Sequence, residues 1–312
     1  MLSRVADALF WMSRYLERAE QAARLLDVAS QLDLDLHGVV ASSHDLHWRA
    51  VADVMQCAPP ADGGSPGVWL PATLTFDADN PCSILSCVKR ARNNARSIRG
   101  SISSDMWREL NKLYWLLNDP DFRVRIQDSP HDLYSAVELS AQIFQGVCDA
   151  TVARDEGWHF IQLGKYLERA DKTLRILEVK GRQLLGRNPL EPSVTNLHWG
   201  SVLKSCLAFQ AYQRIYINRV EPERVVALLL LSPDFPHSVC FCLQQASEAL
   251  RAVGNPSEQP PKAWRLLGRS VSELIFADPE HIELNTTMPL IGAALDRCSQ
   301  ASSAVQEQYF LM

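Results

Sequence analysis

Apolar residues recur at helical spacing from the beginning of the chain. After Val5 they stand three or four residues apart, at Leu9, Met12, Leu16, Ala19, Ala23 and Leu26. This spacing places them on one face of an α-helix. Alternation of apolar and polar residues and Asn-Gly turns, which would indicate β-hairpins, are absent from the sequence. The pattern therefore predicts an all-α fold.

Five segments rich in Pro, Gly, Asp or Ser interrupt the helical pattern. They cover residues 57–71, 118–130, 186–192, 254–261 and 278–289. Such clusters are typical of turns and loops. The stretches between them have the length of ordinary helices, so we expect a bundle of helices joined by these five connections.

The sequence also contains an internal repeat. The motif Tyr15-Leu16-Glu17-Arg18-Ala19 recurs as Tyr166-Leu167-Glu168-Arg169-Ala170, and Leu46-His47-Trp48 recurs at the same offset as Leu197-His198-Trp199. Two further matches follow in the same order, from Pro81 to Pro236 and from Trp107 to Trp264. We predict that residues 1–150 and 151–312 are two copies of one helical unit, packed together about a pseudo-twofold axis.

Composition and charge restrict the possible partners. The 312 residues are 47% hydrophobic and 21% charged, which is typical of a globular protein. The net charge of −5 argues against nucleic acid or an anionic membrane as the main partner, because both require an excess of basic residues. The longest apolar run, residues 225–231, is too short to span a membrane.

Cysteines and the first residues of the chain indicate a compartment. Eight cysteines are scattered along the chain without Cys-x-x-Cys pairs. Arg4 and Asp7 interrupt any apolar segment of the kind that a secretion signal needs. We expect reduced thiols in the cytoplasm.

Several motifs together resemble the bacterial alpha-E family. They are the segment 14–20 around the first Glu-Arg pair, Gly157-Trp158 and Leu163-Gly164 before the second pair, and the segment 91–96, which includes Asn94 and precedes Met106-Trp107. The resemblance covers essentially the whole chain. It implies a helical domain that has Glu-Arg motifs and no settled activity. It also implies a partner, because such proteins are encoded beside circularly permuted ATP-grasp ligases and transglutaminase-like proteins. The second copy departs from this pattern at one position, because it has Lys165 where the first copy has Arg14.

The Glu-Arg helices are expected to be buried on two faces. Glu17 lies about 150° around the helix from the apolar stripe, yet Phe10 and Leu25 share its side, and Ile161 and Ile176 flank Glu168 in the same way. A buried carboxylate must be paired or hydrogen-bonded. One interpretation is an ion pair with Arg14 or Lys165 one turn back, or with an arginine of another helix. The alternative is a cleft in which a ligand or partner meets the charged residues, which are Arg14, Glu17, Arg18, Lys165, Glu168 and Arg169.

Two other sets of charges lie at helical spacing. Glu20 with Arg24 and Asp171 with Arg175 form i, i+4 pairs, which we interpret as surface pairs. Four cations follow one another on one face of a helix in the first copy, at Lys89, Arg92, Arg96 and Arg99. Only one of them has a charged counterpart in the second copy, at Arg251. We expect this basic stripe to face the carboxylates of the Glu-Arg helices, the alternative being an anionic ligand or partner.

Metal and cofactor motifs are weak or missing. His44 and His47 stand one turn apart without a completing ligand, and Glu156 with His159 gives a single Glu-x-x-His, whereas a di-iron bundle needs two. Phosphate-binding and nucleophile motifs do not occur. We predict neither a metal nor a cofactor.

The sequence thus favours an accessory protein. The resemblance implies a non-catalytic or co-catalytic partner of an ATP-grasp-type amide or peptide ligase, which binds the ligase or its peptide-like substrate. The first alternative is an enzyme that uses the Glu-Arg carboxylates as acid and base in a cleft. The second is a purely structural oligomerisation module.

Overall fold

The structure is a helical bundle. The computed structural model describes residues 1–36, 44–61, 63–125, 129–185, 192–216, 219–253, 260–279 and 282–311. Within these ranges every regular element is a helix, which confirms the all-α prediction. None of the described helices is long and apolar enough to cross a membrane.

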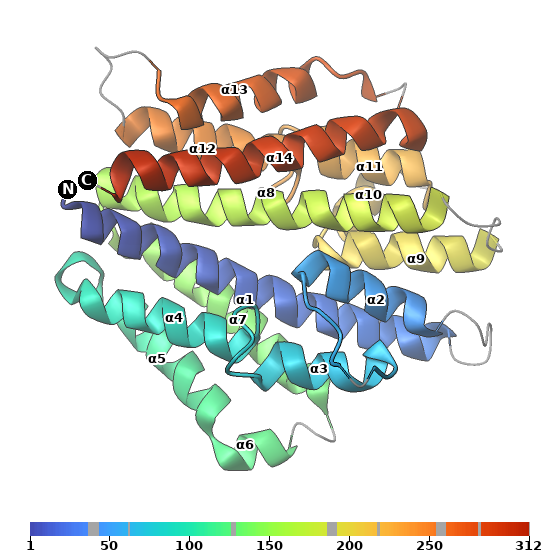
Figure 1. The fold of residues 1–312 in the computed structure, drawn as a ribbon, viewed down its shortest axis with the longest axis horizontal. Coiled ribbons are helices and arrows are strands. Elements are labelled where there is room, and N and C mark those ends of the chain that lie inside the picture. The colour runs from blue at the N-terminus through green and yellow to red at the C-terminus, as the bar shows by residue number, and fades with distance from the viewer. Residues whose placement is uncertain are drawn as a thin grey trace.

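Two long helices form the centre of the bundle. Helix α1 (Ser3–Leu36) and helix α8 (Glu156–Leu185) lie side by side and run in the same direction (Figure 1). The first copy of the Glu-Arg motif lies on α1 and the second lies on α8. Both helices are buried on two sides. Leu16 and Phe10 of α1 point in different directions, as do Leu167 and Ile161 of α8, and each of these side chains is no more than 3% exposed. The predicted burial of the far face is therefore confirmed.

Helices from the first half of the chain cover α1. Figure 1 shows most of them below the central pair. They are α2 (His44–Met55), α3 (Pro66–Phe76), α4 (Ile84–Ser97), the short 3-10 helix η1 (Arg99–Ser101), α5 (Ser104–Asn118), α6 (Pro120–Arg125) and α7 (Pro130–Thr151).

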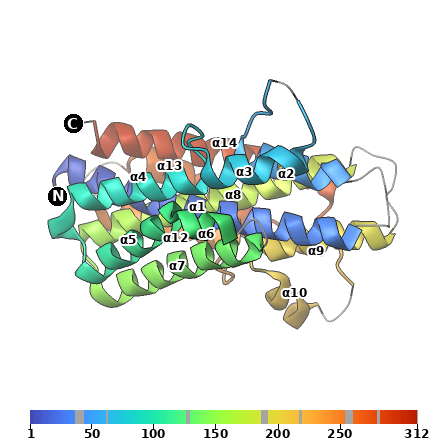
Figure 2. The ribbon, with the colours of Figure 1, turned by 90° about the horizontal axis from the view of Figure 1, so that it is seen from below.

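Helices from the second half cover α8 in a similar order. They are α9 (Pro192–Ser205), α10 (Phe209–Ile215), α11 (Pro222–Leu231), α12 (Val239–Val253), α13 (Lys262–Ile275) and α14 (Leu284–Tyr309). Helices α12, α13 and α14 lie above α8 in Figure 1, and α10 projects from the edge of the bundle in Figure 2.

Contacts within the two halves correspond to each other. Helix α1 contacts α4 and α7 as α8 contacts α12 and α14, and α5 packs on α4 and α7 as α13 packs on α12 and α14. Local details correspond as well: the Ser83 hydroxyl accepts a hydrogen bond from the Ser86 amide, and the Ser238 hydroxyl accepts one from the Phe241 amide. This is the arrangement that a duplication would produce, although the duplication itself stays a prediction. One continuous apolar core extends through both halves.

Two predicted breaks are shorter than the sequence indicated. Helix α3 begins at Pro66 and contains Pro71, and α14 begins at Leu284 and contains Pro289. Each internal proline is the sixth residue of its helix, so only one backbone hydrogen bond of the second turn is lost and the helix continues. Helix α6 occupies part of the predicted break at 118–130. The breaks predicted at 186–192 and 254–261 fall largely outside the described residues.

Gly164 sets the distance between the two central helices. An added Cβ at this position would lie 2.4 Å from the backbone oxygen of Phe10 and 3.3 Å from Cγ of Arg14. No side chain can therefore be accommodated here without moving α1 away from α8. The close approach brings the arginines of each helix within reach of the carboxylate of the other.

Candidate functional site

The two Glu-Arg motifs bind each other. On one side, Arg169 of α8 donates from Nε to Glu17 Oε1 at 2.7 Å and from Nη2 to Oε2 at 3.0 Å. On the other side, Arg18 of α1 donates from Nε to Glu168 Oε1 at 2.7 Å and from Nη2 to Oε2 at 2.9 Å. Both contacts are forked, which is the strongest geometry for an arginine and a carboxylate. Each motif thus supplies the counter-ion of the other.

Both carboxylates are sealed from solvent. Glu17 is 1% exposed and Glu168 is fully buried. Of the two interpretations of the motif, the ion pair to an arginine of another helix describes these contacts. Acid-base chemistry would require a carboxylate that a substrate can reach. In this structure both Glu17 and Glu168 are buried and ion-paired.

The residues one turn before the two motifs behave differently. Arg14 donates from Nε to Glu168 Oε2 at 2.8 Å and also binds the hydroxyl of Ser302 on α14. Its counterpart Lys165 is buried, with Nζ 4.4 Å from the ring centroid of Tyr166. Burial, reinforced by the charge of Arg169, lowers the pKa of Lys165 below its usual value. The sequence difference at this position therefore makes the two sides of the central helix pair unequal.

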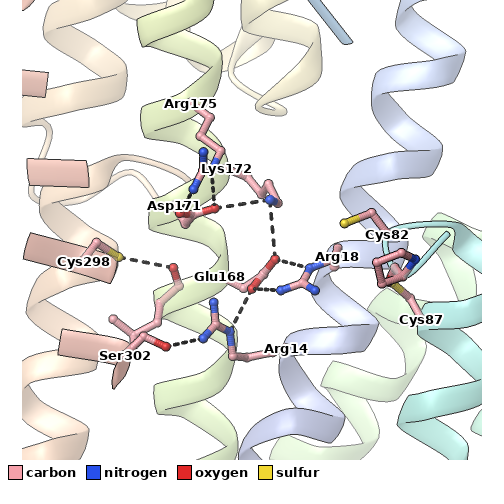
Figure 3. A network of polar contacts seen from close by, with 12 residues as sticks. Arg14, Arg18, Cys82, Cys87, Glu168, Asp171, Lys172, Arg175, Cys298 and Ser302 are labelled. Carbon is pink, nitrogen blue, oxygen red and sulfur yellow. Dashed lines mark hydrogen bonds and ion pairs between the residues drawn. The ribbon is translucent and has the colours of Figure 1, made fainter. Parts of the chain in front are cut away.

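A cluster of cations surrounds Glu168 (Figure 3). Besides Arg14 and Arg18, Lys172 lies one turn further along α8, with Nζ 3.8 Å from Glu168 Oε1 and 3.2 Å from Asp171 Oδ2. Arg175 closes the cluster through a forked contact with Asp171, at 2.9 and 3.1 Å. We call these six residues the cationic cluster.

The electrostatics of Glu168 follow from these neighbours. Burial is the largest single influence and would raise the pKa of this carboxyl group, but Arg18, Arg14 and Lys172 together outweigh it. The pKa of Glu168 therefore lies well below its usual value of 4.5. The same competition, won mainly by Lys172 and Arg175, lowers the pKa of Asp171. Both groups are ionised at neutral pH.

The surroundings of Glu17 have a different charge balance. Glu20 binds Arg24 there, and Arg24 donates to Glu138 at 2.9 Å. Burial, followed by the charge of Glu17, raises the pKa of Glu20. We call this group the balanced cluster. It contains three carboxylates and three cations, which are Glu17, Glu20, Glu138, Arg24, Lys165 and Arg169.

The i, i+4 pairs are not surface pairs, and this prediction was wrong. Glu20 and Arg24 are each 2% exposed, and Asp171 is 9% exposed. Helix α7 covers the first pair and α14 lies beside the second, so that tertiary packing buries positions that lie away from the first apolar stripe. Sequence spacing identified the pairs but could not show which helices cover them.

Open space differs between the two clusters. A cavity of about 200 Å³ adjoins the cationic cluster, lined by its cations and by Gln56, Cys82, Leu167, Cys298, Ser299, Ser302 and Ser303. The corresponding space beside Glu17 and Lys165 is only about 10 Å³, which is enough for about one water molecule. Helical spacing and the Glu-Arg motifs did not indicate that Lys172, Asp171 or the serines of α14 line a cavity. The i, i+4 spacing of Glu168 and Lys172 was the one feature of the sequence that could have placed Lys172 beside this carboxylate.

The basic stripe, which lies on α4 and continues to Arg99 of η1, does not face the Glu-Arg carboxylates as predicted. Arg92 points to α5, where its guanidinium lies 4.4 Å from the ring centroid of Tyr114 and its Nε donates to Asn111 Oδ1 at 2.6 Å. Arg99 lies over Trp107. Lys89 and Arg96 are exposed, and Asn94 is half-buried. The cations of α1 and α8 bind Glu17 and Glu168, and aromatic rings stabilise Arg92 and Arg99.

The residues considered as metal ligands lie apart from this site. His47 Nε2 is 3.3 Å from Asp33, and Glu156 binds the amino group of Met1 at 2.7 Å. Burial lowers the pKa of His159. The side chain of His44 lies outside the described residues. Across the part of the chain that the structure describes, no group of three or more His, Cys, Asp or Glu side chains is arranged to hold a metal ion.

Comparison with known proteins agrees with this picture. A family described as a predicted alpha-helical domain with a conserved ER motif matches residues 1–310. An uncharacterized protein of Mycobacterium bovis is 25% identical over 307 residues, which cover 90% of this chain and 33% of the relative. An uncharacterized protein of Mycobacterium tuberculosis strain H37Rv is 24% identical over 307 residues, with the same coverage.

The chain therefore spans about a third of the length of the curated relatives it matches. No solved structure matches it. The match over nearly the whole chain, together with two Glu-Arg motifs whose residues bind each other, shows that the protein belongs to the Alpha-E family.

Proposed function

We propose that this protein is an accessory subunit of an ATP-grasp-type amide or peptide ligase, or of a related peptide-modification system, and that it binds the ligase or its peptide-like substrate. The observation that carries the proposal is the burial of Glu17 and Glu168 in forked ion pairs. Because these carboxylates are buried and bound to arginines, they suit a scaffold better than an acid-base catalyst. The partner comes from the family resemblance.

Two further observations support a role alongside another polypeptide. In the curated relatives, the matching region is joined to about twice its own length of additional chain. Exposed apolar and basic side chains also occur on the neighbouring helices α4 and α5, where Trp115 is 62% exposed and Lys89 and Arg96 reach the solvent. Such a surface suits a protein contact. A cytoplasmic location is part of the proposal, because all eight cysteines are free thiols.

Reconstitution with an ATP-grasp ligase encoded nearby tests the proposal. We expect ATP-dependent amide formation to require both proteins, with the isolated chain inactive towards ATP. The double variant Lys89→Gln with Arg96→Gln should weaken ligase binding, whereas Arg182→Gln, an exposed cation on α8, should not. ATP hydrolysis by the isolated chain, or full ligase activity without it, would contradict the accessory role.

A further inference from the structure

The cavity beside the cationic cluster has an unusual charge balance. Four cations, Arg14, Arg18, Lys172 and Arg175, surround two carboxylates, Glu168 and Asp171, so that two positive charges have no counter-ion within the cluster. All four cations are largely buried, with side-chain exposures between 5% and 20%. An uncompensated charge in such surroundings is unfavourable unless an anion accompanies it.

The balanced cluster serves as an internal comparison. At the offset of the two Glu-Arg motifs, Gln21 corresponds to Lys172 and Lys165 corresponds to Arg14. Glu138 of α7 adds a third carboxylate to the balanced cluster, where it binds Arg24. The balanced cluster has equal numbers of cations and carboxylates and almost no open space, whereas the cationic cluster has both an excess of charge and a cavity.

The cavity also has the size and the hydrogen-bond donors for an oxygen anion. Its volume of about 200 Å³ exceeds by far the 10–15 Å³ that one water molecule needs, and it can hold a carboxylate or a phosphate group with some water. Arg18 uses Nε and Nη2 for Glu168, which leaves Nη1 uncommitted to this carboxylate. The hydroxyl of Ser302 accepts from Arg14 and can donate its own hydrogen.

We propose that the cavity between α1, α8 and α14 binds a small oxyanion, a carboxylate or a phosphate group, which Arg14, Arg18, Lys172 and Arg175 hold. The planar guanidinium groups suit two oxygens of one acid group, and the ammonium group of Lys172 adds a point charge. The site deepens the proposed function, because a peptide-like substrate and ATP-derived phosphate both carry such groups. The anion can be tested on the isolated protein without the ligase. Failure of the oxyanion site would therefore leave the accessory role untouched, and failure of the accessory role would leave the oxyanion site untouched.

Thermal unfolding at constant ionic strength tests the site. Sodium phosphate and an acetylated glutamyl dipeptide are added to the protein in separate titrations, and sodium chloride of the same ionic strength is the reference. We expect at least one of the two anions to raise the Tm of the wild-type protein, by about 3 °C near saturation. The dipeptide arm identifies a carboxylate as the ligand, and the phosphate arm identifies a phosphate group.

A matched pair of variants separates binding from general salt effects, because phosphate stabilises many proteins non-specifically. Arg175→Gln removes a cation of the cavity. Arg269→Gln removes one from an exposed i, i+4 pair with Glu273 on α13. The rise in Tm should disappear in Arg175→Gln and persist in Arg269→Gln. An equal rise in both variants, or no rise in the wild-type protein beyond that in chloride, would overturn the proposal.

A second measurement uses the wild-type protein alone, in case Arg175→Gln does not fold. Cys82 lines the cavity and is half-buried, whereas Cys57 is half-buried outside it. The bound anion should slow alkylation of Cys82 by an uncharged reagent several-fold and leave Cys57 unchanged, as read by mass spectrometry. Equal rates at Cys82 with and without either anion would refute the oxyanion site.

Discussion

Arg18 of α1 and Glu168 of α8 form a forked ion pair, with nitrogen-oxygen distances of 2.7 and 2.9 Å, across the interface between the two halves of the chain. Glu168 is fully buried and has two further cations beside it, Arg14 and Lys172. The carboxylate therefore neutralises part of the positive charge of these cations, whose burial would otherwise be unfavourable.

Replacing Glu168 with Gln should strongly destabilise the protein. The variant leaves three buried cations around a neutral amide, and removing one partner of a buried pair costs about 3–5 kcal/mol. The measurement is the free energy of unfolding from urea denaturation. Asp105→Asn is the control, because its pair with Arg108 is exposed on both sides and should contribute at most about 1 kcal/mol. A similar small loss for Glu168→Gln would contradict the assigned role.

Stability should also decrease in acid through the same carboxylate. The pKa of Glu168 is lowered in the folded state, so below about pH 4.5 the unfolded chain binds more protons and the free energy of unfolding falls. The pKa of Glu20 is raised, so the folded state binds more protons above pH 4.5, and stability from this group rises as the pH falls through that interval. The two groups therefore act in opposite directions.

Urea denaturation between pH 3 and 7 would separate these contributions. Relative to the wild-type protein, Glu168→Gln should lose less stability below pH 4.5. Glu20→Gln should lack the rise in the free energy of unfolding that the wild-type protein gains as the pH falls from the raised pKa of Glu20 to 4.5. Parallel pH profiles for the two variants would show that their surroundings do not differ as described.

Gly164 should not tolerate even a methyl group. Gly164→Ala would place Cβ 2.4 Å from the backbone oxygen of Phe10, and the required separation of α1 and α8 should cost about 1–3 kcal/mol. The same change at Gly146 of α7, where an added Cβ meets nothing within 4 Å, should stabilise the helix by about 0.5–1 kcal/mol. Thermal or urea unfolding of both variants measures the difference. Equal effects at the two glycines would argue against close packing at Gly164.

The cations of the basic stripe should contribute unequally to stability. Arg92→Ala removes a hydrogen bond to Asn111 and the stacking on Tyr114, and should cost about 1–2 kcal/mol. Lys89→Ala should change stability by less than about 0.5 kcal/mol because the side chain is exposed. In a double-mutant cycle, Arg92→Ala and Glu168→Gln should be additive. Strong coupling between them would restore the prediction that the stripe faces the carboxylates.

The spacing of apolar residues was sufficient to predict the class of fold and the burial of the Glu-Arg helices. Leu9 and Phe10 lie on different faces of α1, and flanking apolar residues on both faces showed that the carboxylate between them would be enclosed. The same reasoning indicated that a buried Glu17 needs a cation. It could not select Arg169 over Arg14, because spacing along one helix does not show how a second helix lies beside it.

The cationic cluster depends on such long-range packing. Asp171 and Arg175 have the spacing of an ordinary surface pair, and only the position of α14 encloses them. Lys172 gains its importance from the neighbouring arginines of α1, which come from the other half of the chain. Arg92 was misplaced for a similar reason: the sequence showed the four cations on one face but not the aromatic residues of α5 opposite them.

The exchange of arginines between α1 and α8 also has a consequence for the order of folding. Arg18 and Glu168 are 150 residues apart in the sequence, and so the ribosome makes the whole first half before the partner of Arg18 exists. During that time Glu17 and Arg18 lack the partners that neutralise them in the folded protein, Arg169 and Glu168. Contacts of such large sequence separation form late and slow the folding of a chain. We therefore expect the joining of α1 to α8, with desolvation of the four motif residues, to be a late step in folding.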